Sequence, residues 1–294
     1  MRIGLLDVDS RIPNLALMKI SQWHKQNGDE VEHYMPLARH TYNKVYASKI
    51  FNFSDGSDIQ DDMIVGGTGI DLKINLPNGI DEMKPDYSLY NYPHNIGFTQ
   101  RGCRFNCSFC VVPRKEGKPK SVNTIEELWT QRSSKFIVLL DNDFFGNPDW
   151  SDRLDEIRGL GLTVNFSQGL NIRIISEKQA QALSTVKFSN INNTKKQVTF
   201  AWDQMKDEKV IKRGFQRVID AGIKPYQMQF YVLIGFDTTP EEDMHRVMMQ
   251  KDWGCDPYAM PYDKTDPYQQ KFVRWVNRRA IFKSCSFEEY QRKQ

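Results

Sequence analysis

The sequence has 294 residues, 39% of them hydrophobic, and a formal net charge of +3. This length and apolar content predict one large folded domain, or one domain with a small addition, rather than a disordered chain. No run approaches the roughly 20 apolar residues of a membrane span, and the N-terminus turns acidic too early for a signal peptide. Five cysteines, an odd number concentrated in one motif, do not indicate a disulfide framework. We therefore expect a cytoplasmic protein without a membrane partner, whose mild charge neither requires nor excludes nucleic acid.

The first 70 residues alternate between predicted strands and helices. A helix is expected over residues 13–27, ending at Gly28, and strands are expected at residues 2–7, 30–35, 44–51 and 63–65. Strands that alternate with helices imply a parallel sheet, so we interpret residues 1–70 as a small, abbreviated flavodoxin-like α/β domain. The glycine-rich residues 66–69 indicate a tight turn, with a phosphate cradle as the alternative.

Residues 71–94 are a predicted connector, because prolines and glycines interrupt any long element there. The connector carries three tyrosines, Tyr87, Tyr90 and Tyr92. We expect them to pack against the domain that follows. The alternative is that they line a substrate channel or stack on bases.

Three cysteines, Cys103, Cys107 and Cys110, then fall in one short loop with the spacing CxxxCxxC. Soft thiolate ligands select zinc, copper(I) or iron–sulfur clusters. A 4Fe–4S cluster normally takes four cysteines, so three would leave one iron open, as a catalytic site needs. The alternatives are a structural zinc site, whose fourth ligand would come from a distant part of the chain, and a thioredoxin-like redox pair at Cys107 and Cys110.

From residue 95 the chain consists of six predicted strand–helix units, and the cysteine loop follows the first strand. The strands are expected at residues 96–99, 136–140, 163–166, 197–202, 227–234 and 257–261. The main helices are expected at residues 150–159, 176–183, 206–221 and 239–251. Six units fit a partial (β/α)6 TIM-like barrel over residues 95–265, in which functional groups gather at the carboxyl ends of the strands.

The cysteine spacing, with the aromatic Phe109 just before the third cysteine, resembles the signature of radical SAM enzymes. The run GFTQRGCRFNCSFCVVPRKEGK is similar to that of uncharacterised members of this superfamily. The resemblance implies that the three cysteines hold a 4Fe–4S cluster whose fourth iron binds S-adenosylmethionine (SAM). It also implies reductive cleavage of SAM to a 5'-deoxyadenosyl radical, with a flavodoxin- or ferredoxin-like protein as reductant. The cofactors carry the radical chemistry, and the protein supplies the positioning.

The region before the motif is similar to two branches of this superfamily. One branch has a cobalamin-binding domain there, but the motif Asp-x-His-x-x-Gly, whose histidine ligates cobalt, is absent, so cobalamin is not expected. Methylthiotransferases have a small α/β domain there with three further cysteines, whereas residues 1–102 contain none. Methyl or methylthio transfer is therefore the second interpretation within the enzyme class.

The resemblance also implies a SAM site at the strand ends. The residues that match its positions are Phe109, Asp141, Asn142, Ser167, Gln168, Arg173, Ile234 and Gly235. Phe109, Ile234 and Gly235 correspond to adenine contacts. Asp141 or Asn142 would receive the SAM amino group, although the usual glycine–glycine–glutamate run is missing. Ser167 and Gln168 would bind the ribose. Arg173 would donate two parallel hydrogen bonds to the SAM carboxylate. The alternative is ordinary loop polarity and helix capping.

Two further carboxylates follow strands. Asp203 ends the fourth strand near the expected target of the radical, so it is a candidate catalytic residue that orients substrate, or else a helix cap. Asp143 is a second candidate for facing the substrate.

Residues 266–294 are a predicted closing segment with one helix over residues 267–282. Its basic residues are Lys271, Arg274, Arg278, Arg279, Lys283, Arg292 and Lys293. With Trp275 and Phe282 among them, they indicate either a nucleic-acid contact or an amphipathic helix with a charged outer face. The chain as a whole therefore predicts a radical SAM enzyme whose substrate is unidentified, with nucleic acid or a nucleotide as a candidate. A non-catalytic RNA-binding protein with a structural metal is the alternative from another class.

Overall fold

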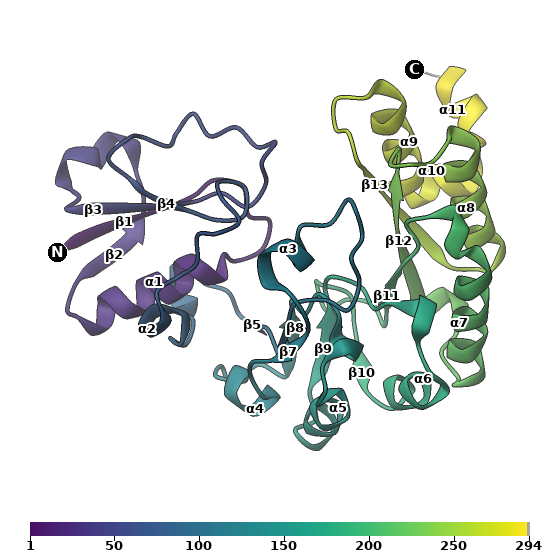
Figure 1. The fold of residues 1–294 in the computed structure, drawn as a ribbon, viewed down its shortest axis with the longest axis horizontal. Coiled ribbons are helices and arrows are strands. Elements are labelled where there is room, and N and C mark those ends of the chain that lie inside the picture. The colour runs from purple at the N-terminus through teal and green to yellow at the C-terminus, as the bar shows by residue number, and fades with distance from the viewer. Residues whose placement is uncertain (293–294) are drawn as a thin grey trace. The chain divides into compact units, whose positions relative to one another are not determined.

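The computed structural model describes residues 1–292, which form two compact units (Figure 1). Unit 1 comprises residues 1–96 with residues 111–117 and 128–134, and unit 2 comprises residues 97–110, 118–127 and the chain from residue 135 onward. Both units combine helices with parallel sheets, which confirms the predicted α/β class. No helix among the described residues has the length and apolar composition to cross a membrane.

Unit 1 is built on one parallel sheet with the strand order β2-β1-β3-β4. Its strands are β1 (Arg2–Asp7), β2 (Glu30–His33), β3 (Lys44–Ser48) and β4 (Ile64–Gly66). Its helices are α1 (Leu15–Gln26), α2 (Asn78–Asp81) and α3 (Val112–Glu116), with 3-10 turns η1 (Pro36–Thr41) and η2 (Tyr87–Leu89). The sheet order matches the first four strands of the flavodoxin-like arrangement.

The alternation of side chains in β1 gives unit 1 a core on each face of the sheet. Ile3 and Leu5 join residues of α1 in one buried cluster, and Tyr34, Tyr42 and neighbouring residues form the other. Gly4 lies under Tyr34 and Tyr42, since a Cβ there would come within 3.3 Å of both rings. Helix α1 begins where the Asn14 side chain accepts the backbone N–H of Leu17.

The glycine-rich residues 66–69 form a close-packed turn. Gly67 has φ +106°, and a Cβ at this position would lie 2.2 Å from the Lys49 carbonyl oxygen. At Gly69 a Cβ would lie 2.6 Å from the Phe51 backbone. These glycines let two backbone segments approach each other, which supports the tight turn over the phosphate cradle.

The expectation that the connector tyrosines pack against the following domain is wrong for Tyr90 and only partly right for Tyr87, whose hydroxyl bonds the N–H and C=O of Ile96 in the first predicted barrel strand. Both pack against the apolar cluster around Ile3 and Leu5 in unit 1. The Tyr90 hydroxyl donates to the Asp7 carboxylate at the end of β1 (2.5 Å). An aromatic ring buries wherever apolar surface is available, and spacing along the chain does not reveal which surface that is.

Unit 2 contains two parallel sheets. The first has the order β10-β9-β8-β5 and the second β11-β12-β13, and a single parallel bridge between Leu170 and Phe200 joins the segment after β9 to β11. The strands are β5 (Asn95–Gly97), of which only Gly97 belongs to unit 2, and β8 (Phe136–Leu139), β9 (Thr163–Phe166), β10 (Lys187–Phe188), β11 (Val198–Ala201), β12 (Met228–Ile234) and β13 (Asp256–Pro261). The two-residue strand β10 was not predicted, because it is too short to show a period.

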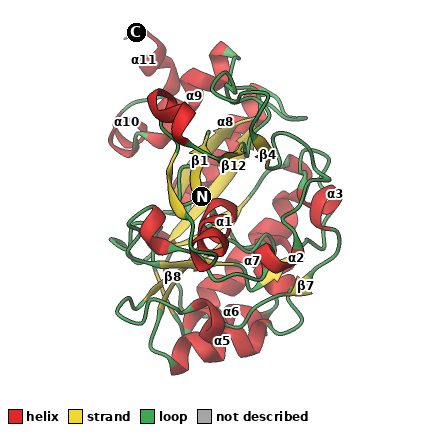
Figure 2. Cartoon of the chain, turned by 90° about the vertical axis from the view of Figure 1, so that its left-hand side faces the viewer, coloured by secondary structure: helices red, strands yellow, loops and turns green. Residues whose placement is uncertain are grey.

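Helices cover one face of these sheets. They are α4 (Ile125–Leu128), α5 (Trp150–Gly159), α6 (Glu177–Ser184), α7 (Glu208–Asp220) and α8 (Pro240–Asp252), with 3-10 turns η3 (Phe144–Gly146), η4 (Ile172–Ile174), η5 (Met205–Asp207) and η6 (Pro225–Gln227). Helices α5 and α6 are neighbours (Figure 2). In β12, Met228, Phe230, Val232 and Ile234 are fully buried, whereas the alternate residues Gln229, Tyr231 and Leu233 are half-buried on the other face.

The closing segment, predicted to contain one helix, contains three in its described part. These are α9 (Pro267–Asn277), α10 (Arg279–Ser284) and α11 (Phe287–Arg292). The break falls at Arg278, whose ψ of 81° leaves the helical region, and Asn277 bonds both the N–H and the C=O of Ala259 in β13. Phe272, Trp275 and Phe282 are buried, which favours the amphipathic closing segment. Lys293 lies outside the described residues.

Candidate functional site

The cysteine loop of unit 2 is held at its ends by a small antiparallel ladder that the sequence did not reveal. Strand β6 (Gln100–Arg101) pairs with β7 (Lys120–Ser121). The Gln100 amide donates to the carbonyls of Arg101 (2.9 Å) and Gly102 (2.7 Å). Within the loop, the Cys110 N–H donates to the Cys107 carbonyl (3.0 Å), and the Phe105 N–H points at the Cys103 sulfur (3.5 Å).

The three thiols of this loop are neighbours. Burial, with smaller contributions from negative charge on Asp143, Cys110 and Cys107, raises the pKa of Cys103 to about 11. Among residues 1–292, no three His, Cys, Asp or Glu side chains are already arranged around one point as metal ligands. The donor set is nevertheless that of a soft-metal or iron–sulfur site, with three thiols on one loop. The structure therefore shows three thiols on one loop that are not arranged as a formed metal site.

Arg104 ties the loop to the end of β8. Its guanidinium donates to both carboxylate oxygens of Asp143, from Nε to Oδ2 at 2.6 Å and from Nη2 to Oδ1 at 2.8 Å. The Asp143 carboxylate is 1% exposed, so this forked ion pair is desolvated on the acid side. The expectation that Asp143 faces a substrate is therefore wrong, because Arg104 occupies both of its oxygens.

Asp141 holds the chain that enters the loop. Its carboxylate accepts the N–H of Thr99 (2.7 Å), the N–H of Gln100 (3.2 Å) and the Thr99 hydroxyl. Burial raises the pKa of Asp141 to about 7, although these hydrogen bonds work in the opposite direction. Asn142, the next residue, is only half-buried.

Arg173 lies beside the cysteines from the segment after β9. It donates to Asp207 (3.0 Å), its Nη2 is 4.0 Å from the Cys107 sulfur, and its guanidinium lies 4.4 Å from the ring centre of Phe105. The other two polar residues predicted in this segment differ from each other. The Ser167 hydroxyl is used internally, donating to the Leu139 carbonyl (2.9 Å), whereas the Gln168 side chain is exposed.

Phe109 connects the cysteine loop to the segment that follows β12. Its ring meets Phe236 edge-on at 5.4 Å, and Phe236 meets Tyr262 at 4.7 Å. Ile234 is buried at the end of β12. Gly235 has φ +73°, its N–H donates to Asp243 (3.2 Å), and a Cβ there would lie 2.1 Å from the Gln269 side chain. Packing within unit 2 thus explains why residue 235 is glycine.

The structure adds a buried ion pair that sequence reasoning missed. Arg246 and Asp243 on α8 are both fully buried and bonded to each other at 2.5 Å. Arg246 also donates to the carbonyls of Trp202, Asp203 and Leu233 at 2.8–2.9 Å, so it fastens together the ends of β11 and β12. The signal in the sequence was a pair of opposite charges three residues apart on the face of α8 that also carries Val247.

The arginine of this ion pair also holds Asp203 in place, because Arg246 donates to the Asp203 carbonyl. The Leu233 N–H donates to the Asp203 carboxylate (3.2 Å), and burial raises the pKa of Asp203. Arg246 and Arg173 supply the positive charge that opposes this shift. A carboxylate with a raised pKa, close to two arginines at a strand end, is a group suited to binding or proton transfer.

Of the predicted residues, the structure brings those of the cysteine loop together with groups after three different strands. Arg104 contacts Asp143 after β8, Cys107 lies beside Arg173 after β9, and Phe109 contacts Phe236 after β12. No protein-family model matches this chain, and no curated protein is significantly similar to it. The case for its function therefore rests on these residues and their geometry.

Proposed function

We propose that this chain is a cytoplasmic radical SAM enzyme in which Cys103, Cys107 and Cys110 hold a 4Fe–4S cluster and SAM is the second cofactor. When bound, this pair would supply a 5'-deoxyadenosyl radical on reduction by a flavodoxin- or ferredoxin-like protein. The observation that carries the proposal is the convergence on the cysteine loop of side chains that follow β8, β9 and β12. Function in barrels of parallel strands gathers at this edge.

The proposal includes a partial (β/α)6 barrel. Strands β5, β8 and β9 run in one sheet and β11, β12 and β13 in the other, and the Leu170–Phe200 bridge joins them in chain order. In this arrangement β10 is a short side strand on β9. The half-buried face of β12, with Gln229, Tyr231 and Leu233, would be the inner surface of the barrel.

The chain's own residues would then take distinct roles. Arg104, through Asp143, fixes the loop on β8. Arg173 is the candidate for the SAM carboxylate, since one of its nitrogens already lies beside Cys107. Asp141 or Asn142 would receive the SAM amino group, and the Asp141 oxygens also accept bonds from Thr99 and Gln100. Asp203 would orient the substrate.

Phe109, Ser167, Gln168, Ile234 and Gly235 remain predicted SAM contacts on this proposal. The aromatic contact between Phe109 and Phe236 would give the adenine an apolar edge. The substrate could be a nucleic acid or nucleotide, and methyl or methylthio transfer is the second reaction class. Because the sequence lacks the motif Asp-x-His-x-x-Gly, the proposal does not include cobalamin.

The test uses anaerobically reconstituted full-length protein. Iron and sulfide content and the EPR spectrum would be recorded with SAM and dithionite, and deoxyadenosine would be measured by chromatography. We expect a 4Fe–4S signal that SAM perturbs, together with deoxyadenosine, in the wild type and in a Cys285→Ala control. Both should be lost in Cys107→Ala. Zinc in place of iron, or a cluster that neither binds nor cleaves SAM, would contradict the proposal and favour the structural-metal alternative.

A further inference from the structure

Two hollows lie at the amino-terminal edge of the strands in unit 2, opposite the edge that carries the cysteine loop. The first, of about 490 Å³, lies beside the starts of β9 and β10 and is lined in part by Lys187, Lys195 and Lys196. The second, of about 230 Å³, lies beside the start of β13 and is lined in part by Lys251, Arg279 and Lys283. Lys195 lines both, so the two hollows adjoin.

The residues lining these hollows are strongly unbalanced in charge. They include six cationic side chains and one carboxylate, Asp256, whereas the whole chain has a net charge of only +3. Asp256 pairs with Lys195 (2.7 Å) and Arg279 (3.2 Å) at once, so it neutralises them only in part. Among the uncharged groups of the first hollow, the Ser184, Thr185 and Ser189 hydroxyls donate to carbonyls of the chain itself, so the lysines are the main attraction for an anion.

Several of these cations are held in position. The Lys251 ammonium donates to the Phe282 carbonyl (3.2 Å) and lies 5.1 Å from the Phe282 ring centre. The Lys196 ammonium lies 5.3 Å from the ring centre of Phe188. Because their positions are partly fixed, less side-chain entropy is lost when an anion binds.

An exposed aromatic ring accompanies the cations. Tyr226 lines the second hollow and is 64% exposed, although most aromatic residues of unit 2 are buried. It lies in η6, two residues after the exposed Lys224. A solvent-exposed ring next to lysines is the combination that stacks a base while the cations take the neighbouring phosphates.

We propose that this surface, defined by Lys187, Lys195, Lys196, Lys251, Arg279, Lys283 and Tyr226 and called the basic tract, binds single-stranded nucleic acid. Two adjoining hollows with a shared lysine fit successive phosphates of one strand better than a single small anion. The tract goes beyond the proposed function, since it lies at the other end of the strands, roughly 20 Å away along the seven residues of β12. It would dock a nucleic acid rather than act on it.

The basic tract includes some of the residues in the segment 271–293, for which the sequence predicted a nucleic-acid contact. In that segment, Phe272 and Trp275 are buried and unavailable for stacking. Of its basic residues, Arg279 and Lys283 line the second hollow. The partners they need, Lys195, Tyr226 and Lys251, come from other parts of the chain.

The test measures fluorescence anisotropy of a labelled oligouridylate, roughly ten nucleotides long, with the full chain at several salt concentrations. We expect log K to fall against log salt with a slope of roughly −3 to −4, as for about five neutralised phosphates. Lys196→Ala and Lys283→Ala should each weaken binding and make the slope shallower by about 0.7. Tyr226→Ala should weaken binding roughly 5- to 100-fold with the slope unchanged.

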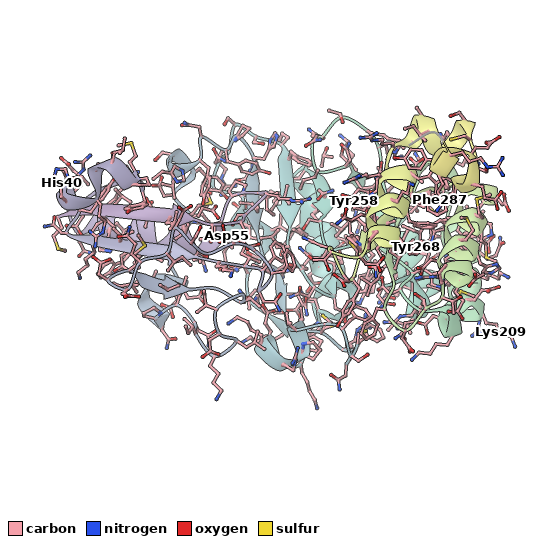
Figure 3. All side chains as sticks on the ribbon, turned by 90° about the horizontal axis from the view of Figure 1, so that it is seen from above. His40, Asp55, Lys209, Tyr258, Tyr268 and Phe287 are labelled. Atoms are coloured by element: carbon pink, nitrogen blue, oxygen red, sulfur yellow. The ribbon has the colours of Figure 1, made fainter. Side chains whose placement is uncertain are left out.

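Two control variants match these changes elsewhere on unit 2. Lys209→Ala removes one exposed charge from α7, where this side chain projects outward (Figure 3). Tyr262→Ala removes a 54% exposed ring at the other end of β13. Both should bind like the wild type.

The proposal is overturned if the controls weaken binding as much as the tract variants, or if the wild type does not bind the oligonucleotide at low salt. It is also overturned if uridine monophosphate or inorganic phosphate competes as well as the strand does. Since the assay needs neither iron nor SAM, it is independent of the test of cluster chemistry.

Discussion

The two edges of the strands in unit 2 use charged residues in opposite ways. At the carboxyl edge, charges are paired around buried carboxylates: Arg246 and Asp243 are both buried, and the exposed Arg104 binds the buried Asp143. At the amino edge, cations line open hollows with one carboxylate among them. Buried pairs are rigid and cost much to break, so they suit the positioning of loops and cofactors. Exposed like charges contribute little to stability, and they attract a polyanion over a distance.

The largest effect should follow from breaking the buried pair on α8. Arg246→Met leaves the Asp243 carboxylate buried without its partner and three strand-end carbonyls without their donor. We expect a loss of about 3–5 kcal/mol in the free energy of unfolding, measured by urea denaturation. The double variant Arg246→Met with Asp243→Leu should recover part of this loss, since no charge stays buried. If the single variant is as stable as the wild type, the pair does not hold β11 and β12 together.

The next effect concerns pH and Asp141. Its folded pKa of about 7 lies above the ordinary value of 3.8, so the folded state binds more protons than the unfolded state between these values. The contribution of this group to stability is therefore fully present below pH 3.8 and is lost as the pH rises through 7. The loss is up to roughly 4 kcal/mol.

Asp141→Asn tests this sign. The amide keeps the shape of the side chain and does not titrate in this range. Between pH 4 and pH 7, Asp141 should make the wild type less stable as the pH rises. The variant should not show this decrease when its free energy of unfolding is measured by urea denaturation at each pH. Identical pH dependence in wild type and variant would mean that Asp141 titrates normally in the fold.

A smaller effect is expected at Gly235. Gly235→Ala meets both a positive φ of 73° and the side chain of Gln269, whereas Gly222→Ala meets a positive φ of 95° in open space. Backbone strain of this kind costs about 1–3 kcal/mol. We therefore expect Gly235→Ala to lower the melting temperature more than Gly222→Ala. Equal shifts would show that Gln269 moves aside at no cost.

The smallest effect on stability is expected at the amino edge. Lys283→Ala removes an exposed cation that lines a hollow, so its urea unfolding curve should overlay that of the wild type. The same variant should weaken oligonucleotide binding, as described above. Destabilisation comparable to that of Arg246→Met would erase the distinction between the two edges.

The pattern of apolar residues was sufficient to predict most elements of both units. Strands β1, β3, β9 and β12 and helices α5, α7 and α8 lie within a few residues of the predicted ranges, and Thr239 caps α8 with Glu242 as its partner. The prediction failed where a strand was too short to show a pattern, and where the sequence did not mark the end of a helix. Strand β10 has only two residues, and the break at Arg278 depends on Asn277 reaching the backbone of Ala259.

The sequence by itself determined the α/β class, the order of the strands and helices, and the position of the three cysteines directly after a strand. These follow from periodicity and spacing, which are local properties of the chain. Only the tertiary structure decided which charges are paired, because Arg104 meets Asp143 across 39 residues and Lys195 meets Asp256 across 61. It also decided that Asp141 is buried and that Lys195 lines both hollows. Pairing and desolvation depend on what surrounds a side chain in space, and a local pattern carries no information about those neighbours.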